Sequence, residues 1–169
     1  MVRQSKDEIE SKRMMLLHKV SKFTSRISDL KLIYNSKIRS ILETSCVVWH
    51  SSLTLKQRAS LERLQKSAFR IILKSRYESY ENALIQMNMD TLDKRREKLC
   101  MKFAKNCLRH DKLRSMFSVN STSHAMKKRC TDKFKVNKAS TNRYKFSAIP
   151  YMQRLLNENE KELQQVIGS

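Results

Sequence analysis

Glycine and proline are nearly absent from this sequence. Its 169 residues contain a single Gly, Gly168, and a single Pro, Pro150. Tight β-hairpins and phosphate-binding loops depend on glycine at special backbone positions, so the chain has almost no material for either. The shortage favours helices joined by polar connections, in one domain long enough to bury a modest core.

Acidic residues are also scarce. The chain has 16 Asp and Glu against 36 Lys and Arg, which gives a formal net charge of +20. An imbalance of this size indicates a polyanionic partner, and nucleic acid is the commonest one. An anionic membrane surface is the lesser alternative.

Long apolar runs are missing too. No run of about 18 apolar residues occurs, so no membrane-spanning segment is predicted. No apolar region follows Arg3 and Lys6 to form a secretory signal. We therefore expect an intracellular protein, nuclear or cytoplasmic, without a membrane partner. In a reducing compartment the cysteines are expected to be free thiols rather than disulfides: Cys46, Cys100, Cys107 and Cys130.

Apolar residues recur at the spacing of an α-helix through the first 118 positions. We predict helices over about 6–25, 28–49, 54–75, 79–87 and 90–108. Ser5 with Glu8 and Thr54 with Gln57 have the spacing of capping boxes. The second helix ends in the run Cys46–Trp49, which is apolar all round and is predicted to be deeply buried. A β-strand is the competing interpretation of this run, but it would interrupt an unbroken 3.6-residue period, so we favour a helix.

The inward faces follow from the same spacing. For the helix over 54–75 the predicted inward residues are Leu61, Leu64, Ala68, Ile71 and Ile72. For the helix over 90–108 they are Leu92, Leu99, Cys100, Phe103 and Cys107, with Leu113, Met116 and Phe117 packing its end onto the core.

The periodicity fails between 119 and 147, where Ser, Thr, Asn and Lys dominate. This composition is typical of a basic flexible linker. Pro150 then fits the first turn of a C-terminal helix within 148–169. The predicted fold is all-α: an irregular bundle of about five helices in 1–118, a basic disordered insertion, and a C-terminal helix.

Two of the predicted helices have basic faces. The first face, here called the basic row, consists of Arg63, Lys66, Arg70 and Lys74. The second includes Lys94, Arg95 and Lys98 and continues through Lys102, Lys105 and Arg109. A charge run on a helix is usually a solvated face. In the basic row, however, no acid follows a cation four residues later on the helix, and about one cation per turn suits contact with backbone phosphates.

The predicted linker mixes aromatic and basic residues. Phe134, Tyr144 and Phe146 lie among cations that include Lys127, Lys128 and Arg129. Aromatic rings among cations can stack on unpaired bases while the cations hold phosphates. A flexible tail whose aromatics fold onto the core is an equal alternative.

Trp49 and the cysteines invite functional interpretations that the pattern does not favour. Trp49 lies on the long apolar face, which favours a core anchor over a base-stacking residue. Cys46 with His50, and Cys107 with His110, could each supply two metal ligands on one helical face. A structural zinc ion needs four, and no further spacing completes a site, so no metal or cofactor is expected.

No catalytic motif is visible. Two-metal polymerisation needs paired aspartates, and no adjacent aspartates occur in the chain. A Walker loop, a nucleophile elbow and a zinc-protease helix are absent as well. The sequence therefore predicts a protein that is not an enzyme and has no small-molecule substrate.

Three blocks in fixed order resemble a known family. They are Ile41–His50, which contains an aliphatic-Trp pair; Leu61–Leu73, of the type Leu-Glu-x-x-Gln-x-x-Ala-x-Arg-x-Ile; and Thr91–Cys100. Together they resemble the segment after the polymerase active site in Jockey-like non-LTR retrotransposon reverse transcriptases. The likeness extends to Arg13–Leu17 and to Arg143–Phe146 with Ile149–Tyr151. The family's catalytic aspartates and its cysteine-histidine knuckle are missing here.

The resemblance implies a thumb-like region, over 1–118, that closes on a primer-template duplex beside an upstream polymerase domain. We therefore expect sequence-independent binding of DNA, RNA or a hybrid duplex. The expected contacts are Arg63, Lys66, Arg70, Lys74, Lys94, Arg95, Lys98, Lys127, Lys128 and Arg129. The alternative is a helical protein-interaction module, or a relic transposon-derived reading frame without a specific activity.

Overall fold

Helices account for the regular structure of the described residues. The computed structural model describes residues 2–119, 132–136 and 138–167, with side chains from 11 to 161 within those ranges. Within these ranges no β-strand forms, and the one isolated bridge joins Val119 to Phe134. The all-α prediction and the C-terminal helix are confirmed. None of the helices in this part combines the length and apolarity that crossing a bilayer requires.

The chain forms two structural units that alternate along the sequence. The first comprises 1–44 and 54–95, and the second comprises 45–53 and 96–169. Each unit is described separately below. The domain boundaries expected at 118 and 147 stay a prediction.

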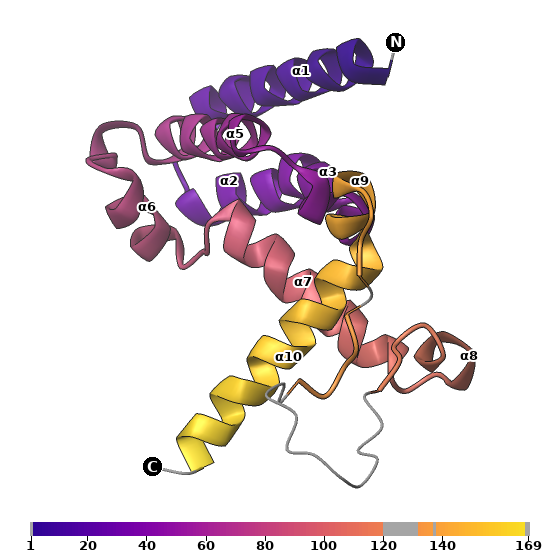
Figure 1. The fold of residues 1–169 in the computed structure, drawn as a ribbon. Helices are drawn as coiled ribbons and strands as arrows, with labels where there is room; N and C mark the ends of the chain where they lie inside the picture. Colours follow the sequence, from indigo (N-terminus) through magenta and orange to yellow (C-terminus); the bar gives the residue numbers. More distant parts are fainter. Residues whose placement is uncertain (1, 120–131, 137, 168–169) are drawn as a thin grey trace, which may run out of the picture. The chain divides into compact units, whose positions relative to one another are not determined.

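The first unit is built around three helices. α1 (Val2–Phe23), α2 (Ile27–Ile33) and α5 (Leu55–Leu73) pack against one another, and α6 (Tyr80–Met87) follows α5 (Figure 1). A π-helix (Tyr34–Arg39) and the short α3 (Ser40–Glu43) continue α2, and α7 (Leu92–Cys107) begins in this unit. The buried core includes Leu17, Leu30, Tyr34, Leu42, Phe69, Ile72, Met87 and Leu92.

The prediction of one continuous helix over 28–49 is wrong. The helix ends at Glu43, because Ser45 adopts a left-handed conformation with φ 52°, and α4 (Cys46–Trp49) starts anew. Serine carries no sequence signal for this conformation, which usually needs glycine or asparagine. The break also coincides with the point, after Thr44, where the chain first passes from the first unit to the second.

The π-helical segment keeps the buried face of this region straight. Leu30, Tyr34, Ile38 and Leu42 are all buried and are spaced four residues apart. In an α-helix each four-residue step turns the side chain about 40° past a full circle, so three steps would move the face by about 120°. The wider i→i+5 turn of a π-helix offsets this drift. The sequence therefore predicted an apolar face in this region, but it did not predict the π-helix.

Capping explains where α5 begins. The Thr54 hydroxyl accepts from the Gln57 backbone N–H, and the Gln57 side chain accepts from the Thr54 N–H, which confirms the predicted capping box. The other predicted box is wrong, because α1 already begins at Val2 and Ser5 lies inside it. Ser79 caps α6 as predicted, by accepting from Asn82.

The buried face of α5 is rotated from the predicted one. Its buried residues are Gln65, Ala68, Phe69, Ile72 and Leu73, whereas Leu61, Leu64 and Ile71 are only partly buried. The Phe69 ring packs between those of Tyr34 and Tyr80, with centroids 5.8 and 6.0 Å away. Within the basic row, Lys66 meets Tyr80 of α6 and Lys74 meets Ser21 near the end of α1.

The second unit contains α4, a 3-10 turn (His50–Ser52), most of α7, α8 (Asp111–Arg114), α9 (Asn142–Lys145) and α10 (Ala148–Ile167). Its core contains Ala104, Cys107, Phe117, Phe134, Met152 and Leu156. Pro150 lies in the first turn of α10 as predicted, and it is fully buried. Phe117 packs the end of α7 as predicted.

Several predictions for this unit are wrong. The run 46–49 is not deeply buried throughout, since Val48 is 70% exposed. Phe103 is exposed on α7, because the neighbouring Ala104 takes the inward position. Leu113 and Met116 are also exposed, so Phe117 alone of that group is buried.

Phe134 follows one of the two interpretations of the aromatics in the basic segment, the one in which they fold onto the core. It is 3% exposed, its N–H donates to Asn157 Oδ1, and its carbonyl accepts from Asn157 Nδ2, each at 2.9 Å. An amide that satisfies both backbone groups of one buried residue fixes the position of that residue on α10. Phe134 is therefore part of the core and not a base-stacking residue.

Candidate nucleic-acid interface

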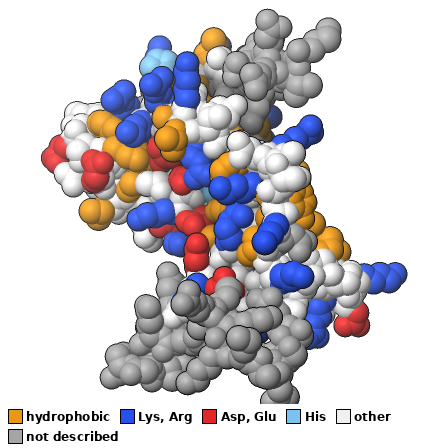
Figure 2. All heavy atoms as spheres, in the orientation of Figure 1, with side chains coloured by type: hydrophobic (Ala, Val, Ile, Leu, Met, Phe, Trp, Pro, Cys, Tyr) orange, Lys and Arg blue, Asp and Glu red, His pale blue; other side chains and the backbone are white. Residues whose placement is uncertain are grey.

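The basic row follows α5 to its end in the first unit. Arg63, Arg70 and Lys74 are exposed, and Lys66 is partly buried. Figure 2 shows several Lys and Arg side chains close together over α1 and α5, at the top of the view. Within the described part of the chain, no ion pair joins a member of the row to an acid. The row therefore keeps its charge at the surface.

Aromatic rings position two of these cations. Lys66 Nζ lies 4.7 Å from the centroid of the Tyr80 ring, and Arg70 Cζ lies 5.4 Å from that of Tyr77. A ring attracts a cation without cancelling its charge, so both cations are oriented and still available to an anion. Sequence reasoning missed both tyrosines, although their position just after the row was a usable signal.

Glu62 is the acid nearest to the row in sequence, four residues before Lys66, but its carboxylate serves the core. Its Oε1 accepts hydrogen bonds from the Tyr80 hydroxyl and, at 3.3 Å, from the Leu92 N–H. Burial, reinforced by Glu62, raises the pKa of Tyr80 well above its ordinary value, so this tyrosine remains neutral. Glu62 thus fastens α6 and the start of α7 to α5 and leaves Lys66 uncompensated.

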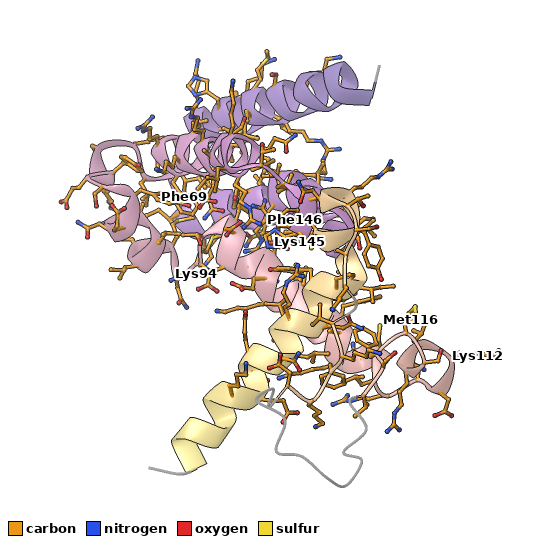
Figure 3. All side chains as sticks on the ribbon, viewed as in Figure 1. Phe69, Lys94, Lys112, Met116, Lys145 and Phe146 are labelled. Atoms are coloured by element: carbon orange, nitrogen blue, oxygen red, sulfur yellow. The ribbon has the colours of Figure 1, made fainter. Side chains whose placement is uncertain are left out.

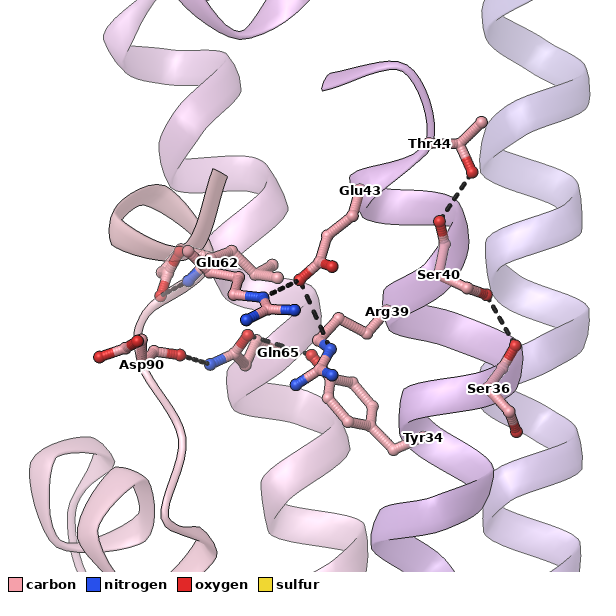
Figure 4. A network of polar contacts seen from close by, with 11 residues as sticks. Tyr34, Ser36, Arg39, Ser40, Glu43, Thr44, Glu62, Gln65 and Asp90 are labelled. Carbon is pink, nitrogen blue, oxygen red and sulfur yellow. Dashed lines mark hydrogen bonds and ion pairs between the residues drawn. The ribbon is translucent and has the colours of Figure 1, made fainter. Parts of the chain in front are cut away.

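Gln65 lies on the same buried side of α5. Its side chain is fully buried, its Oε1 accepts from the Tyr34 hydroxyl at 3.0 Å, and its Nε2 donates to the Asp90 carbonyl at 3.0 Å (Figure 4). Gln65 therefore holds the segment before α7 against α5. The two polar residues that open the Leu-Glu-x-x-Gln pattern are structural, and they fix the orientation of the row.

The cations at the start of α7 have different roles. Arg95 Nε lies 3.4 Å from Glu43 Oε1, which also pairs with Arg39 at 3.4 Å (Figure 4). Lys94 is exposed and projects from the start of α7 (Figure 3), and Lys98, in the second unit, is exposed as well. The structure therefore commits Arg95 to an ion pair, and Lys94 and Lys98 lie at exposed positions.

The remaining predicted contacts are only partly described. Lys127, Lys128 and Arg129 lie outside the described residues. Of the aromatics in that segment, Tyr144 and Phe146 are 40% and 46% exposed, and Lys145 Nζ lies 5.7 Å from the Phe146 ring centroid (Figure 3). This pair, in the second unit, retains the mixture of ring and cation on which base stacking depends.

Trp49 lies partly buried beneath a charged side chain in the second unit. The Arg96 guanidinium is fully buried, with its Cζ 5.6 Å from the Trp49 ring centroid. The sequence analysis assigned no role to Arg96 and did not name it on the basic face of α7. The structure shows that this cation belongs to the interior.

The cysteines and histidines of the second unit contact other side chains. Cys46, Cys100 and Cys107 are free thiols as predicted, and Cys130 lies outside the described residues. A hydrogen bond with Cys46, together with burial, raises the pKa of Cys100, and burial raises that of Cys107. The His50 ring meets Tyr151 edge-on at 5.7 Å. Among the residues that the structure describes, no group of three or more His, Cys, Asp or Glu is placed to hold a metal ion.

Comparison of the chain with protein-family models, with curated proteins and with solved structures gives no match.

Proposed function

We propose that this protein binds nucleic acid through backbone phosphates, without reading base sequence, and that the basic row of α5 is the main contact. The observation that carries the proposal is the environment of the row. Tyrosine rings orient Lys66 and Arg70, a backbone carbonyl orients Lys74, and no member of the row pairs with an acid among the described residues. Lys94 and Lys98 are proposed as additional contacts, and Lys127, Lys128 and Arg129 remain candidates from the sequence.

The physical basis is the release of counterions. Each phosphate that a Lys or Arg neutralises frees condensed cations from the nucleic acid, which favours binding regardless of sequence. Four cations at about one per helical turn, of which Arg63, Arg70 and Lys74 are exposed and Lys66 is partly buried, can follow a strand for a few phosphates. A net charge of +20 adds long-range attraction for any polyanion.

The resemblance to the post-palm segment of Jockey-like reverse transcriptases supports the same proposal. In that context the chain would be a thumb-like, non-catalytic fragment that grips a primer-template duplex beside a polymerase domain. The residues of the Leu61–Leu73 pattern divide accordingly: Glu62 and Gln65 hold the helix in place, and Arg70 faces outward.

The salt dependence of binding tests the proposal. We expect the full chain to bind duplex and single-stranded oligonucleotides of shuffled sequence with similar affinity, measured by fluorescence anisotropy at several salt concentrations. Four phosphate contacts predict a log-log slope of about −3.6 or steeper for duplex DNA and about −2.8 or steeper for a single strand. A slope near zero, or a large preference for one sequence over its shuffled form, would contradict backbone binding.

Exposed apolar side chains favour the alternative function, a protein-interaction module. Phe23, Leu32 and Ile85 of the first unit are 91%, 68% and 77% exposed. Large exposed apolar residues are common at protein contact sites when they form a continuous patch. Weak nucleic-acid binding with little response to salt would favour this alternative.

A further inference from the structure

A hollow of about 380 Å³ opens in the first unit between the ends of α1 and α5. α1 contributes His18, Ser21 and Lys22, and the α5 side contributes Arg70, Ile71 and Lys74. Arg70 and Lys74 belong to the basic row, whereas His18 and Lys22 come from a helix that the sequence did not connect with binding. The two helices lie side by side here (Figure 1).

The charge around the hollow favours an anion. Among the described residues that line it, three are permanent cations and none is acidic. The C-terminal ends of α1 and α5 both lie here, and their partial charges sum to about −1. Three cations therefore leave a local excess of about +2 after the helix ends are offset. One of the three cations is needed to offset the two helix ends. The other two remain available to an anion.

Lys74 is held at the edge of the hollow. Its Nζ donates to the Ser21 carbonyl at 2.6 Å, which satisfies a carbonyl in the last turn of α1. Its backbone has φ 51° and ψ −120°, a conformation that favours glycine. The lysine is strained in a conformation that glycine would adopt without strain. Its ammonium group is held by the Ser21 carbonyl, and Lys74 lines the hollow together with Arg70.

The lining also suits the shape of a nucleotide unit. A volume of 380 Å³ is at the lower end of the range for ligand sites and leaves room beyond a phosphate group. Ile71 and the aliphatic stems of the cations provide apolar surface for a sugar. The planar guanidinium of Arg70 can donate two parallel hydrogen bonds to phosphate oxygens, and His18 offers a ring N–H.

We propose that this hollow binds one phosphate group of a nucleic-acid strand, with Lys22, Arg70 and Lys74 as its cationic ligands and His18 as a further hydrogen-bond donor. The proposal rests on the proposed function and extends it. The strand leaves the basic row at Arg70 and crosses to α1, so α1 forms part of the interface.

The test compares two lysines of α1. Lys22→Gln removes a cation of the hollow, and Lys19→Gln removes an exposed cation of the same helix that does not line it. We expect Lys22→Gln to reduce the log-log salt slope for nucleic-acid binding by about 1. Lys19→Gln should leave it unchanged. Equal slopes for the two variants, with both folded by circular dichroism, overturn the proposal.

A second arm uses inorganic phosphate as the probe and does not depend on nucleic-acid binding. Titration of the full chain should shift the NMR resonances of His18 and Ser21, and Lys22→Gln should abolish the shift while Lys19→Gln preserves it. If inorganic phosphate shifts these resonances but the chain binds no nucleic acid, the proposed function is refuted and the hollow is a site for free phosphate only. Nucleic-acid binding with no phosphate shift at these residues overturns the hollow alone.

Lys74→Gly provides a variant in which relief of the positive-φ conformation offsets the loss of the hydrogen bond to the Ser21 carbonyl, so we expect it to remain folded. It removes the ammonium group and relieves the positive-φ conformation, so lost binding cannot be attributed to backbone strain. We expect a reduction of the salt slope by about 1, as for Lys22→Gln. A 5′-phosphorylated oligonucleotide that binds more tightly than its 5′-hydroxyl form identifies a terminal phosphate, and equal binding identifies an internal one.

Discussion

α5 and α7 are both basic helices in the sequence, but the structure gives their cations different roles. On α5 the cations of the basic row lie outside, over tyrosine rings and beside a carbonyl. On α7, Arg95 pairs with Glu43, and the next residue, Arg96, is fully buried against the Trp49 ring. Helical charge patterns therefore predict where cations are concentrated. Their burial and partners decide which of them can meet a ligand.

The largest effect in this comparison is expected at Arg96. Arg96→Ala should lower the free energy of unfolding by about 2–4 kcal/mol, because it leaves a cavity and removes the contact with the Trp49 ring. Denaturant titration followed by the fluorescence of Trp49, the only tryptophan, measures this. Lys98→Ala, at an exposed position of the same helix, should cost less than about 0.5 kcal/mol. Similar costs for the two variants would show that Arg96 is not an interior cation.

A somewhat smaller effect is expected on the buried side of α5. Gln65→Ala removes the hydrogen bonds to the Tyr34 hydroxyl and the Asp90 carbonyl, and should lower the free energy of unfolding by about 2–3 kcal/mol. Gln65→Met keeps the side-chain volume and isolates the hydrogen-bonding part of that loss. Lys66→Gln, on the neighbouring exposed side, should change stability by less than about 0.5 kcal/mol. If Lys66→Gln were as destabilising as Gln65→Ala, the row would be a structural element.

The pH dependence of stability should reveal the two buried thiols of α7, Cys100 and Cys107. The pKa values of Cys100 and Cys107 are raised in the folded protein above the ordinary value of 9.0. The folded state therefore holds these protons more tightly than the unfolded state. Their stabilising contribution is complete below pH 9 and is lost as the pH rises above it. The denaturant concentration at the unfolding midpoint should decrease as the pH rises from about 8 to about 10. It should decrease less in the double variant Cys100→Ala/Cys107→Ala. A parent midpoint that stays constant over this range contradicts the assignment.

The sequence predicted the parts of the fold that have local causes. The spacing of Thr54 and Gln57 predicts the start of α5, and Ser79 marks the start of α6, because capping depends on residues three apart. The break at Ser45 and the π-helix were missed, since a left-handed serine and a wider turn are imposed by packing of the whole unit. The two interpretations of Phe134 stayed open for the same reason: its partner, Asn157, lies 23 residues away in sequence.

The candidate site shows the same division. The basic row was visible because its residues recur along one helix. The hollow was not visible, because His18 and Lys22 reach Arg70 and Lys74 only through the packing of α1 on α5. Arg95 was assigned to the site because its partner, Glu43, belongs to another element. Relations between helices, rather than within them, account for what sequence reasoning could not supply.

The most direct test of the central claim compares two variants that lose the same charge. One replaces Arg63, Lys66, Arg70 and Lys74 by Gln, and the other replaces four exposed cations of α7 and its continuation, Lys102, Lys105, Arg109 and Lys112. Glutamine preserves helix propensity, so both should remain folded. We expect the log-log salt slope for duplex binding to shrink by about 3–4 units in the first variant and by less than about 1 in the second. Equal reductions in two folded variants would show that binding follows net charge, and would contradict the assignment of the interface to α5.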